Sequence, residues 1–258
     1  MITPRKLPVG FQTMSPAMGT MQSYQRYLFD RVQPCLRRRV VEIGVGHGMT
    51  TRWILQSSDA EVLAADIDEH CLNQVRSEQA SPRLHTLRVD LNDVKSVAQC
   101  AAFQPDSIVC INVLEHIEQD EKALRALAGI AVLGAKLALI VPAHPLLYGR
   151  MDSEAGHFRR YTRASLHSVL VASGWTAVET VYINALGALG WYFHNRLRRS
   201  AGLADHSVNS QMLSADRWLP RVAAWTDPVM KRCFGLSVLA IAQKTSANDA
   251  AVHSARNG

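Results

Sequence analysis

The chain has 258 residues, long enough to bury one sizeable hydrophobic core. Because 48% of the residues are hydrophobic and only 19% are charged, the composition indicates a folded globular protein and excludes a disordered one. The net charge of +6 is spread thinly, so it permits acidic partners without requiring them. Five widely spaced cysteines form no CxxC pair, which argues against a disulfide framework and favours a reducing, cytoplasmic setting.

The N-terminal region, residues 1–34, is expected to form a loose arm followed by a lid helix. Tyr24, Tyr27, Leu28 and Val32 recur at helical spacing shortly before Pro34. The first residues contain no apolar segment typical of a signal peptide, and no apolar run elsewhere is long enough to span a bilayer. We therefore expect neither a signal peptide nor a transmembrane helix.

Strand and helix patterns alternate over the next 140 residues. Strands are predicted at 39–44, 61–67, 84–90, 107–112 and 135–143, and helices at 49–57, 69–79 and 117–133. A helix at 163–173 and strands at 175–183 and 234–244 would complete the sheet. This alternation predicts an α/β fold with a doubly wound, mainly parallel, seven-stranded sheet, formed by residues 35–183 plus 234–244.

Residues 184–233 separate the last two predicted strands and are too long for a simple turn. Their pattern predicts a largely helical insert, which would act as a cap over a bound substrate, with one helix ending near Met230. The tail, residues 245–258, is expected to be disordered.

A glycine-rich segment follows the first predicted strand directly. Glu42, Gly44, Gly46 and Gly48 form an acid-x-G-x-G-x-G pattern between an apolar strand and a helix. Glycine lets the backbone turn tightly and approach a ligand closely. A dinucleotide-binding G-x-G-x-x-G loop would need glycine where Met49 stands, so that alternative is disfavoured.

This segment resembles motif I of the class I, Rossmann-like S-adenosylmethionine-dependent methyltransferases. In that family the loop passes under the methionine part of the cofactor, which implies S-adenosyl-L-methionine as the methyl donor here. The resemblance extends to three later strand ends, and it points to the small-molecule type.

Acidic residues end the second and third predicted strands. Asp66 lies about twenty residues beyond the loop, where a carboxylate can accept both ribose hydroxyls, with Asp68 as the alternative or as the cap of the next helix. By resemblance, Asp90 would meet the adenine amino group and Leu91 would pack on the ring. Asn112, at the end of the fourth strand, corresponds to the family's motif IV and is assigned to the cofactor in the same way.

The Leu-Glu-His run after Asn112 is shared by many small-molecule methyltransferases and adds to the resemblance. His116 in this run is a candidate general base, since imidazole titrates near neutral pH. An equally good interpretation is a histidine that fixes a helix start or lines the cofactor pocket.

The segment after the fifth strand concentrates polar and aromatic residues that should face the acceptor. Its G-H-x-R-R-Y-T pattern resembles one found in a bacterial subset of these enzymes. The candidate catalytic residues here are His144, Tyr148 and His157, and the candidate substrate-binding residues are Arg159, Arg160, Tyr161 and, in the insert, Trp191. The arginines could instead bind a carboxylate such as Glu154, and the insert aromatics could simply pack against the core.

The function expected from these patterns is in-line methyl transfer to nitrogen or oxygen of a small molecule, such as a natural-product or sugar/lipid intermediate. A non-catalytic cofactor-binding subunit of a partner enzyme is one alternative. Peripheral membrane association with a glycolipid acceptor is another, suggested by apolar residues 182–193 beside Arg196, Arg198 and Arg199. No Asn-Pro-Pro-Tyr-like run follows the fourth strand, which disfavours a nucleic-acid acceptor, and the spacing of histidines and cysteines suggests no metal.

Overall fold

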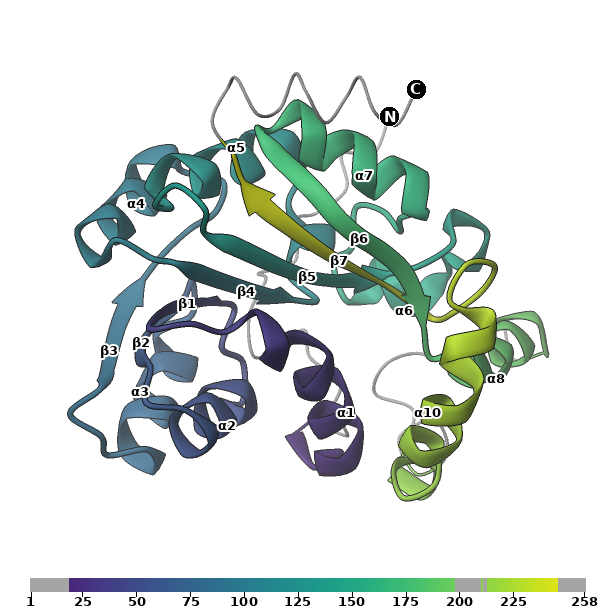
Figure 1. The fold of residues 1–258 in the computed structure, drawn as a ribbon. Helices are drawn as coiled ribbons and strands as arrows, with labels where there is room; N and C mark the ends of the chain where they lie inside the picture. The colour runs from purple at the N-terminus through teal and green to yellow at the C-terminus, as the bar shows by residue number, and fades with distance from the viewer. Residues whose placement is uncertain (1–18, 198–209, 211–212, 246–258) are drawn as a thin grey trace.

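The computed structural model describes residues 19–197, 210 and 213–245 (Figure 1). A single seven-stranded sheet has the order β3-β2-β1-β4-β5-β7-β6. Its strands are β1 (Arg39–Ile43), β2 (Glu61–Asp66), β3 (Leu84–Arg88), β4 (Ser107–Ile111), β5 (Lys136–Pro142), β6 (Trp175–Ile183) and β7 (Ser237–Lys244). Strands β1 to β5 pair in parallel, whereas β7 runs antiparallel to β5 and β6. The expected doubly wound, mainly parallel sheet is confirmed.

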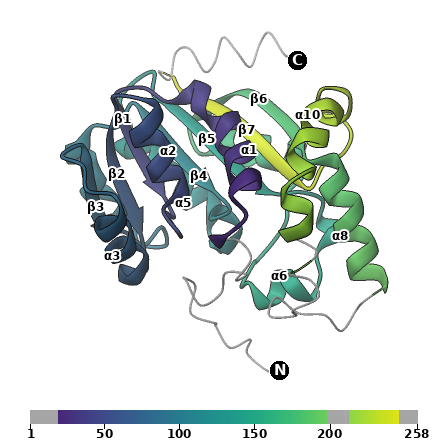
Figure 2. The same ribbon diagram turned by 90° about the horizontal axis from the view of Figure 1, so that it is seen from below.

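Helices cover both faces of the sheet (Figures 1 and 2). One face carries α1 (Gln22–Val32), α2 (Met49–Ser57) and α3 (Glu69–Glu78), and the other carries α4 (Val94–Ala98), α5 (Asp120–Ile130) and α7 (Arg163–Ala172). The short α6 (Arg150–Glu154) lies in the segment after β5. Two helices, α8 (Ala185–Leu197) and α10 (Leu219–Met230), lie between β6 and β7 in the chain, as expected of a helical insert.

Successive strand residues point to opposite faces of the sheet and build a hydrophobic core on each face. Val40 and Val62 pack with α1 and α2, while their neighbours Val41 and Leu63 pack with α5 and α7. Because both faces are buried, the central strands contain nearly continuous apolar runs rather than alternating ones. The apolar residues of the central strands pack in these cores, whereas polar residues such as Asp66 lie at the strand ends.

Two short helices were not expected from the sequence. The helix α4 has only five residues, with the Asp93 side chain accepting a hydrogen bond from the Lys95 amide at its N-terminus, and α6 is equally short. Segments of this length cannot display a helical repeat in the sequence, so local capping and packing determine them. The strands end one or two residues earlier than expected, except β6, which has the expected bounds, and β7, which begins later and ends as expected.

A buried polar cluster joins the insert to the N-terminal helix. The Asp227 carboxylate in α10 accepts hydrogen bonds from the Tyr27 hydroxyl, from Arg31 at 2.9 Å and from the Asn184 amide at 2.9 Å. Asp216 accepts from the Tyr24 amide at 2.7 Å and so satisfies the first turn of α1. These contacts hold α1 and α10 together beside the end of β6 (Figure 2).

Several expectations concern residues outside the described ranges. They are the loose arm within 1–18, the disordered tail within 246–258, and Arg198 and Arg199 of the basic group. Among the described residues, no helix is long and apolar enough to cross a bilayer.

Candidate functional site

Parallel pairing brings the chemistry-bearing segments to one edge of the sheet. Strands β2, β1, β4 and β5 are neighbours and run in the same direction, so their carboxyl ends meet. The glycine loop follows β1, Asp66 ends β2, Asn112 follows β4, and the segment 143–161 follows β5. In open α/β sheets this edge is where ligands bind.

The loop after β1 has glycine at every second position. Gly44, Gly46 and Gly48 all have positive φ angles, of 77°, 49° and 71°. The Gly44 amide donates to the Ala65 carbonyl at 2.7 Å, which fixes the start of the loop against β2. A Cβ atom on Gly44 would lie 2.2 Å from Cγ2 of Val113, so no other residue fits there without displacement.

Glu42 lies beneath this loop and is only 3% exposed. Its carboxylate accepts a hydrogen bond from the Thr51 hydroxyl in the first turn of α2. Burial raises the pKa of Glu42 to about 8, Thr51 lowers it in part, and the nearby Asp66 raises it further. Glu42 therefore lies where it fixes the loop to the helix that follows.

Asp66 and Asp68 have different roles. The Asp66 carboxylate is 8% exposed and accepts from the Gly46 amide at 3.2 Å and from the Asp68 amide at 2.8 Å. Burial raises the pKa of Asp66, and these two amides oppose that shift. Asp68 instead accepts from the His70 amide as the N-cap of α3, which is the capping role considered for it.

The end of β3 lies beside Asp66, because the Val89 amide donates to the Asp66 carbonyl at 2.9 Å. Asp90 is half-buried, and its Oδ1 accepts from the Asn92 amide at 2.8 Å. Leu91 is buried in the core. Both residues are thus close to the edge at which the cofactor role was expected.

The turn after β4 is held in an unusual backbone conformation. Asn112 has a positive φ of 53°, and its amide donates to the Ile140 carbonyl at 2.8 Å. The short 3-10 helix Leu114–His116 follows. Burial, and then the charge of His157, lowers the pKa of His116 to about 4, so its imidazole is neutral at pH 7 and only a weak base.

Asp152, which the sequence did not single out, organises the segment after β5. Its buried carboxylate accepts from Arg160 Nε at 2.8 Å and lies 2.9 Å from His157 Nδ1. Burial alone would raise the pKa of Asp152, but His157 and Arg160 together hold it below its usual value. The expected arginine–carboxylate contact therefore exists, with Asp152 rather than Glu154 as the partner of Arg160.

The other candidate residues of this segment fall into two groups. Arg159 binds Asp120 at 2.8 Å, and the buried Tyr161 donates to the same carboxylate at 2.8 Å, on the side of α5. The Arg160 guanidinium lies 4.9 Å from the ring centroid of Trp191 in α8. Arg160 and Trp191 thus join the insert to the sheet edge, whereas Arg159 and Tyr161 contact α5.

His144 and Tyr148 lie apart from each other. The His144 ring stacks between Tyr182 and Phe234, with centroid distances of 4.5 and 5.0 Å, and has a positive φ of 56°. Tyr148 is 42% exposed and donates to the His157 carbonyl at 2.7 Å. The His116 and His157 rings, in contrast, meet at 4.7 Å in an edge-to-face contact.

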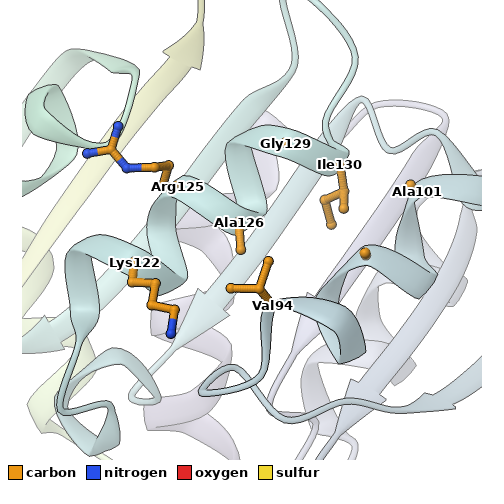
Figure 3. Close-up of a pocket in the computed structure, with 8 residues that line it drawn as sticks. Val94, Ala101, Lys122, Arg125, Ala126, Gly129 and Ile130 are labelled. Atoms are coloured by element: carbon orange, nitrogen blue, oxygen red, sulfur yellow. The ribbon is translucent and has the colours of Figure 1, made fainter.

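A hollow of about 370 Å³ lies elsewhere, between α4 and α5 on the outside of the sheet (Figure 3). Its lining consists mainly of small apolar side chains, with Lys122 and Arg125 at one side. It contains none of the strand-end residues described above, so we do not assign the site to it.

Replacement of Gly44 tests whether this position requires a residue without a Cβ atom. Gly44→Ala should lower the free energy of unfolding by at least roughly 1–3 kcal/mol, because φ is positive and the new Cβ meets Val113. Gly129→Ala is the matched control, since Gly129 lies in α5 with open space where a Cβ would stand, and should add about 0.5–1 kcal/mol. Urea unfolding measures both, and equal effects would contradict the geometry.

The raised pKa of Glu42 predicts a pH-dependent stability. Between about pH 4.5 and 8 the native state keeps a proton that the unfolded chain loses, so stability should fall as pH rises through this window. Glu42→Gln should remove that contribution, up to about 5 kcal/mol, and flatten the profile. Glu61→Gln, at an exposed residue of β2, is the control in urea unfolding at several pH values. A Glu42→Gln profile parallel to wild type would contradict the assignment.

Comparisons with known proteins agree with this arrangement. Residues 41–137 match the family model described as a methyltransferase domain. An uncharacterized protein from Synechococcus sp. is 30% identical over 112 residues, which are 42% of this chain. The chain spans only about a quarter of the length of that relative, 26%.

Two solved structures resemble the fold over most of this chain. One belongs to a Haloferax volcanii complex of the Trm112 methyltransferase activator with a candidate methyltransferase, with a TM-score of 0.61, 13% identity, and coverage of 90% of this chain and 95% of that one. The other is Haemonchus contortus phosphoethanolamine N-methyltransferase 2 with S-adenosyl-L-methionine, with a TM-score of 0.56, 12% identity, and coverage of 86% and 53%. The chain therefore has the class I, Rossmann-like methyltransferase fold, and its residues 41–137 match the model of a methyltransferase domain.

Proposed function

We propose that the protein is an S-adenosylmethionine-dependent methyltransferase acting on nitrogen or oxygen of a small molecule. The observation that carries the proposal is the loop Gly44–Gly48, with three glycines at positive φ beside the Asp66 carboxylate, at the carboxyl edge of the sheet. The methyltransferase domain spans this edge, and S-adenosyl-L-methionine is bound in one of the similar structures.

The residues at this edge fit the methyl donor. A carboxylate has roughly four acceptor positions. Asp66 uses one on each oxygen for the Gly46 and Asp68 amides, which leaves capacity on both oxygens for two ribose hydroxyls. As the family resemblance implies, the glycine loop would admit the methionine part, Asp90 and Leu91 would contact the adenine, and Asn112 would belong to the cofactor site. Residues 35–183 plus 234–244 would form this cofactor-binding core.

The acceptor would enter from the side of the segment 143–161 and the insert. S-adenosylmethionine supplies an electrophilic methyl group, so the protein needs mainly to align the acceptor and exclude water. Arg160 and Trp191 are candidates to orient it, and α1 with the insert helices α8 and α10 would cover it. His116, His157, Tyr148 and His144 are the candidates for contact with the acceptor. We expect a cytoplasmic setting, since all five cysteines are free.

Replacement of Asp66 tests the cofactor assignment. Asp66→Asn should weaken binding of S-adenosylhomocysteine by about 1.5–3 kcal/mol, the range for hydrogen bonds to a charged group. Asp68→Asn is the matched control, because asparagine caps a helix as well as aspartate does. Isothermal titration of each folded variant measures the affinity.

Equal affinities for the two variants would refute the role of Asp66, and no binding by the wild-type chain would refute the proposed function. Methylated product formed by the purified chain alone would exclude a non-catalytic subunit. Binding without product against a panel of small acceptors would favour that alternative.

The outer surface of α10 favours a second candidate, methyl transfer to a membrane-associated glycolipid. Trp218, Trp225 and Val229 share one helix face and are 51%, 84% and 77% exposed. The exposed Arg221 lies beside them. Exposed tryptophans with flanking basic residues are typical of a helix that rests in the interface of an anionic bilayer.

Liposome flotation tests this candidate. The wild-type chain should float with vesicles containing anionic phosphatidylglycerol, and less so in high salt, because charge and apolar burial both contribute. Trp225→Ser should reduce the floating fraction several-fold, whereas Val178→Ser, at an exposed apolar residue of β6, should not. Flotation equal for all three chains, or absent from wild type, would eliminate the membrane candidate.

A further inference from the structure

Glu115 is a fully buried acid that lacks a hydrogen-bond partner for its side chain. It is 0% exposed, and neither carboxylate oxygen has a partner among the described residues. One potential ligand atom each from Glu115, His116 and His157 lies within 4.8 Å of the other two. Burial raises the pKa of Glu115 to about 7, so near neutral pH its ionised form needs a positive charge among these atoms.

Asp152 determines which nitrogen of His157 faces this cluster. The Asp152 carboxylate is buried, binds Arg160 and lies 2.9 Å from His157 Nδ1. An ionised carboxylate only accepts hydrogen bonds, so Nδ1 carries the hydrogen and a neutral His157 presents the lone pair of Nε2. The Nε2 atom lies 3.9 Å from Oε1 of Glu115. Two acceptors would then face each other across the gap.

A shared proton does not account well for this arrangement. A hydrogen bond from an imidazolium to a carboxylate would bring the two atoms to about 2.7–2.9 Å, as between His157 and Asp152. The 3.9 Å gap is too long for it. The third residue, His116, also has a buried Nδ1 without a hydrogen-bond partner among the described residues. Three atoms with lone pairs that point toward one another can bind a metal cation together, whereas a single proton would bridge only two of them.

We propose that Glu115, His116 and His157 bind one divalent transition-metal ion, with Zn²⁺ as the favoured species. Two imidazoles and a carboxylate suit Zn²⁺, and ligands about 2.0–2.2 Å from it would stand roughly 3.3 Å apart. The ligand atoms now lie within 4.8 Å of one another, so binding would bring them closer by up to about 1.5 Å. Asp152 would orient His157 through Nδ1, as carboxylates do behind many zinc-bound histidines. Three protein ligands leave a fourth position open to water or another oxygen ligand.

The ion would join two segments that meet at the sheet edge. Glu115 and His116 belong to the 3-10 helix after β4, and His157 follows α6. The Phe158 amide already donates to the Glu115 carbonyl at 2.8 Å, so the two segments are already adjacent. The inference does not depend on the proposed methyl transfer, because it concerns binding of the ion alone.

Metal analysis of the full-length chain tests the site. The chain is prepared with Cys233→Ser, because this exposed thiol could bind zinc adventitiously, then freed of metal and titrated with Zn²⁺ against a chromogenic chelator. One ion should bind per chain. Glu115→Gln and His157→Gln should weaken binding more than about 100-fold, and Asp152→Asn about 10–100-fold. The control His167→Gln, at an exposed residue of α7, should bind as the parent does.

Two further measurements give a result even if some of the ligand variants do not fold. Zn²⁺ should raise the Tm of the parent and leave that of any folded Glu115→Gln or His157→Gln chain unchanged. Co²⁺ bound to the parent should give visible d–d absorption without a thiolate charge-transfer band. Absence of stoichiometric Zn²⁺ binding by the parent, a thiolate band, or unchanged affinity in folded ligand variants would overturn the proposal.

Discussion

The parallel pairing of β2, β1, β4 and β5 decides where every polar group of interest can lie. Neighbouring parallel strands end at the same edge, and each loop that leaves this edge begins within one strand spacing of the next. The buried cores on both faces keep the strands in register, so the positions of Gly44, Asp66 and Asn112 follow from the pairing. The glycine loop adds a second constraint, since Gly44 lies against Val113 and so couples the end of β1 to the turn after β4.

The elements that the sequence predicted well are those with a long repeat or a strong local signal. The helix α2 has the predicted bounds, and α10 ends at Met230 as predicted. In both helices the spacing of apolar residues and the residues at the helix ends gave a clear signal. The helices α4 and α6 were missed, since five residues cannot display a period and their ends depend on Asp93 and on tertiary packing. The strand β7 enters the sheet between β5 and β6 and runs antiparallel to both, a direction for which its sequence pattern carries no signal.

The arrangement of the segments that follow β1, β2 and β3 was more predictable than that of the segment 143–161, for a physical reason. The glycine loop, Asp66 and the end of β3 can each be recognised from a few consecutive residues. Backbone pairing of the parallel strands then brings these three features to the same edge. The contacts of the segment 143–161 are set by partners far apart in the sequence, such as Glu115 with His157. Asp152 has no distinguishing motif, and its importance appears only when its two partners, His157 and Arg160, converge on it.

Asp152 also connects the two halves of the edge. Its carboxylate fixes His157, which faces Glu115 and His116 after β4, and it fixes Arg160, which stacks on Trp191 of α8. Because both contacts use one oxygen, Oδ1, movement of Arg160 with the insert would alter the hydrogen bond that orients His157. The insert is in turn joined to α1 through Asp227 and Tyr27. A molecule that binds under the insert can therefore affect the histidine cluster through a continuous series of hydrogen bonds and ring contacts.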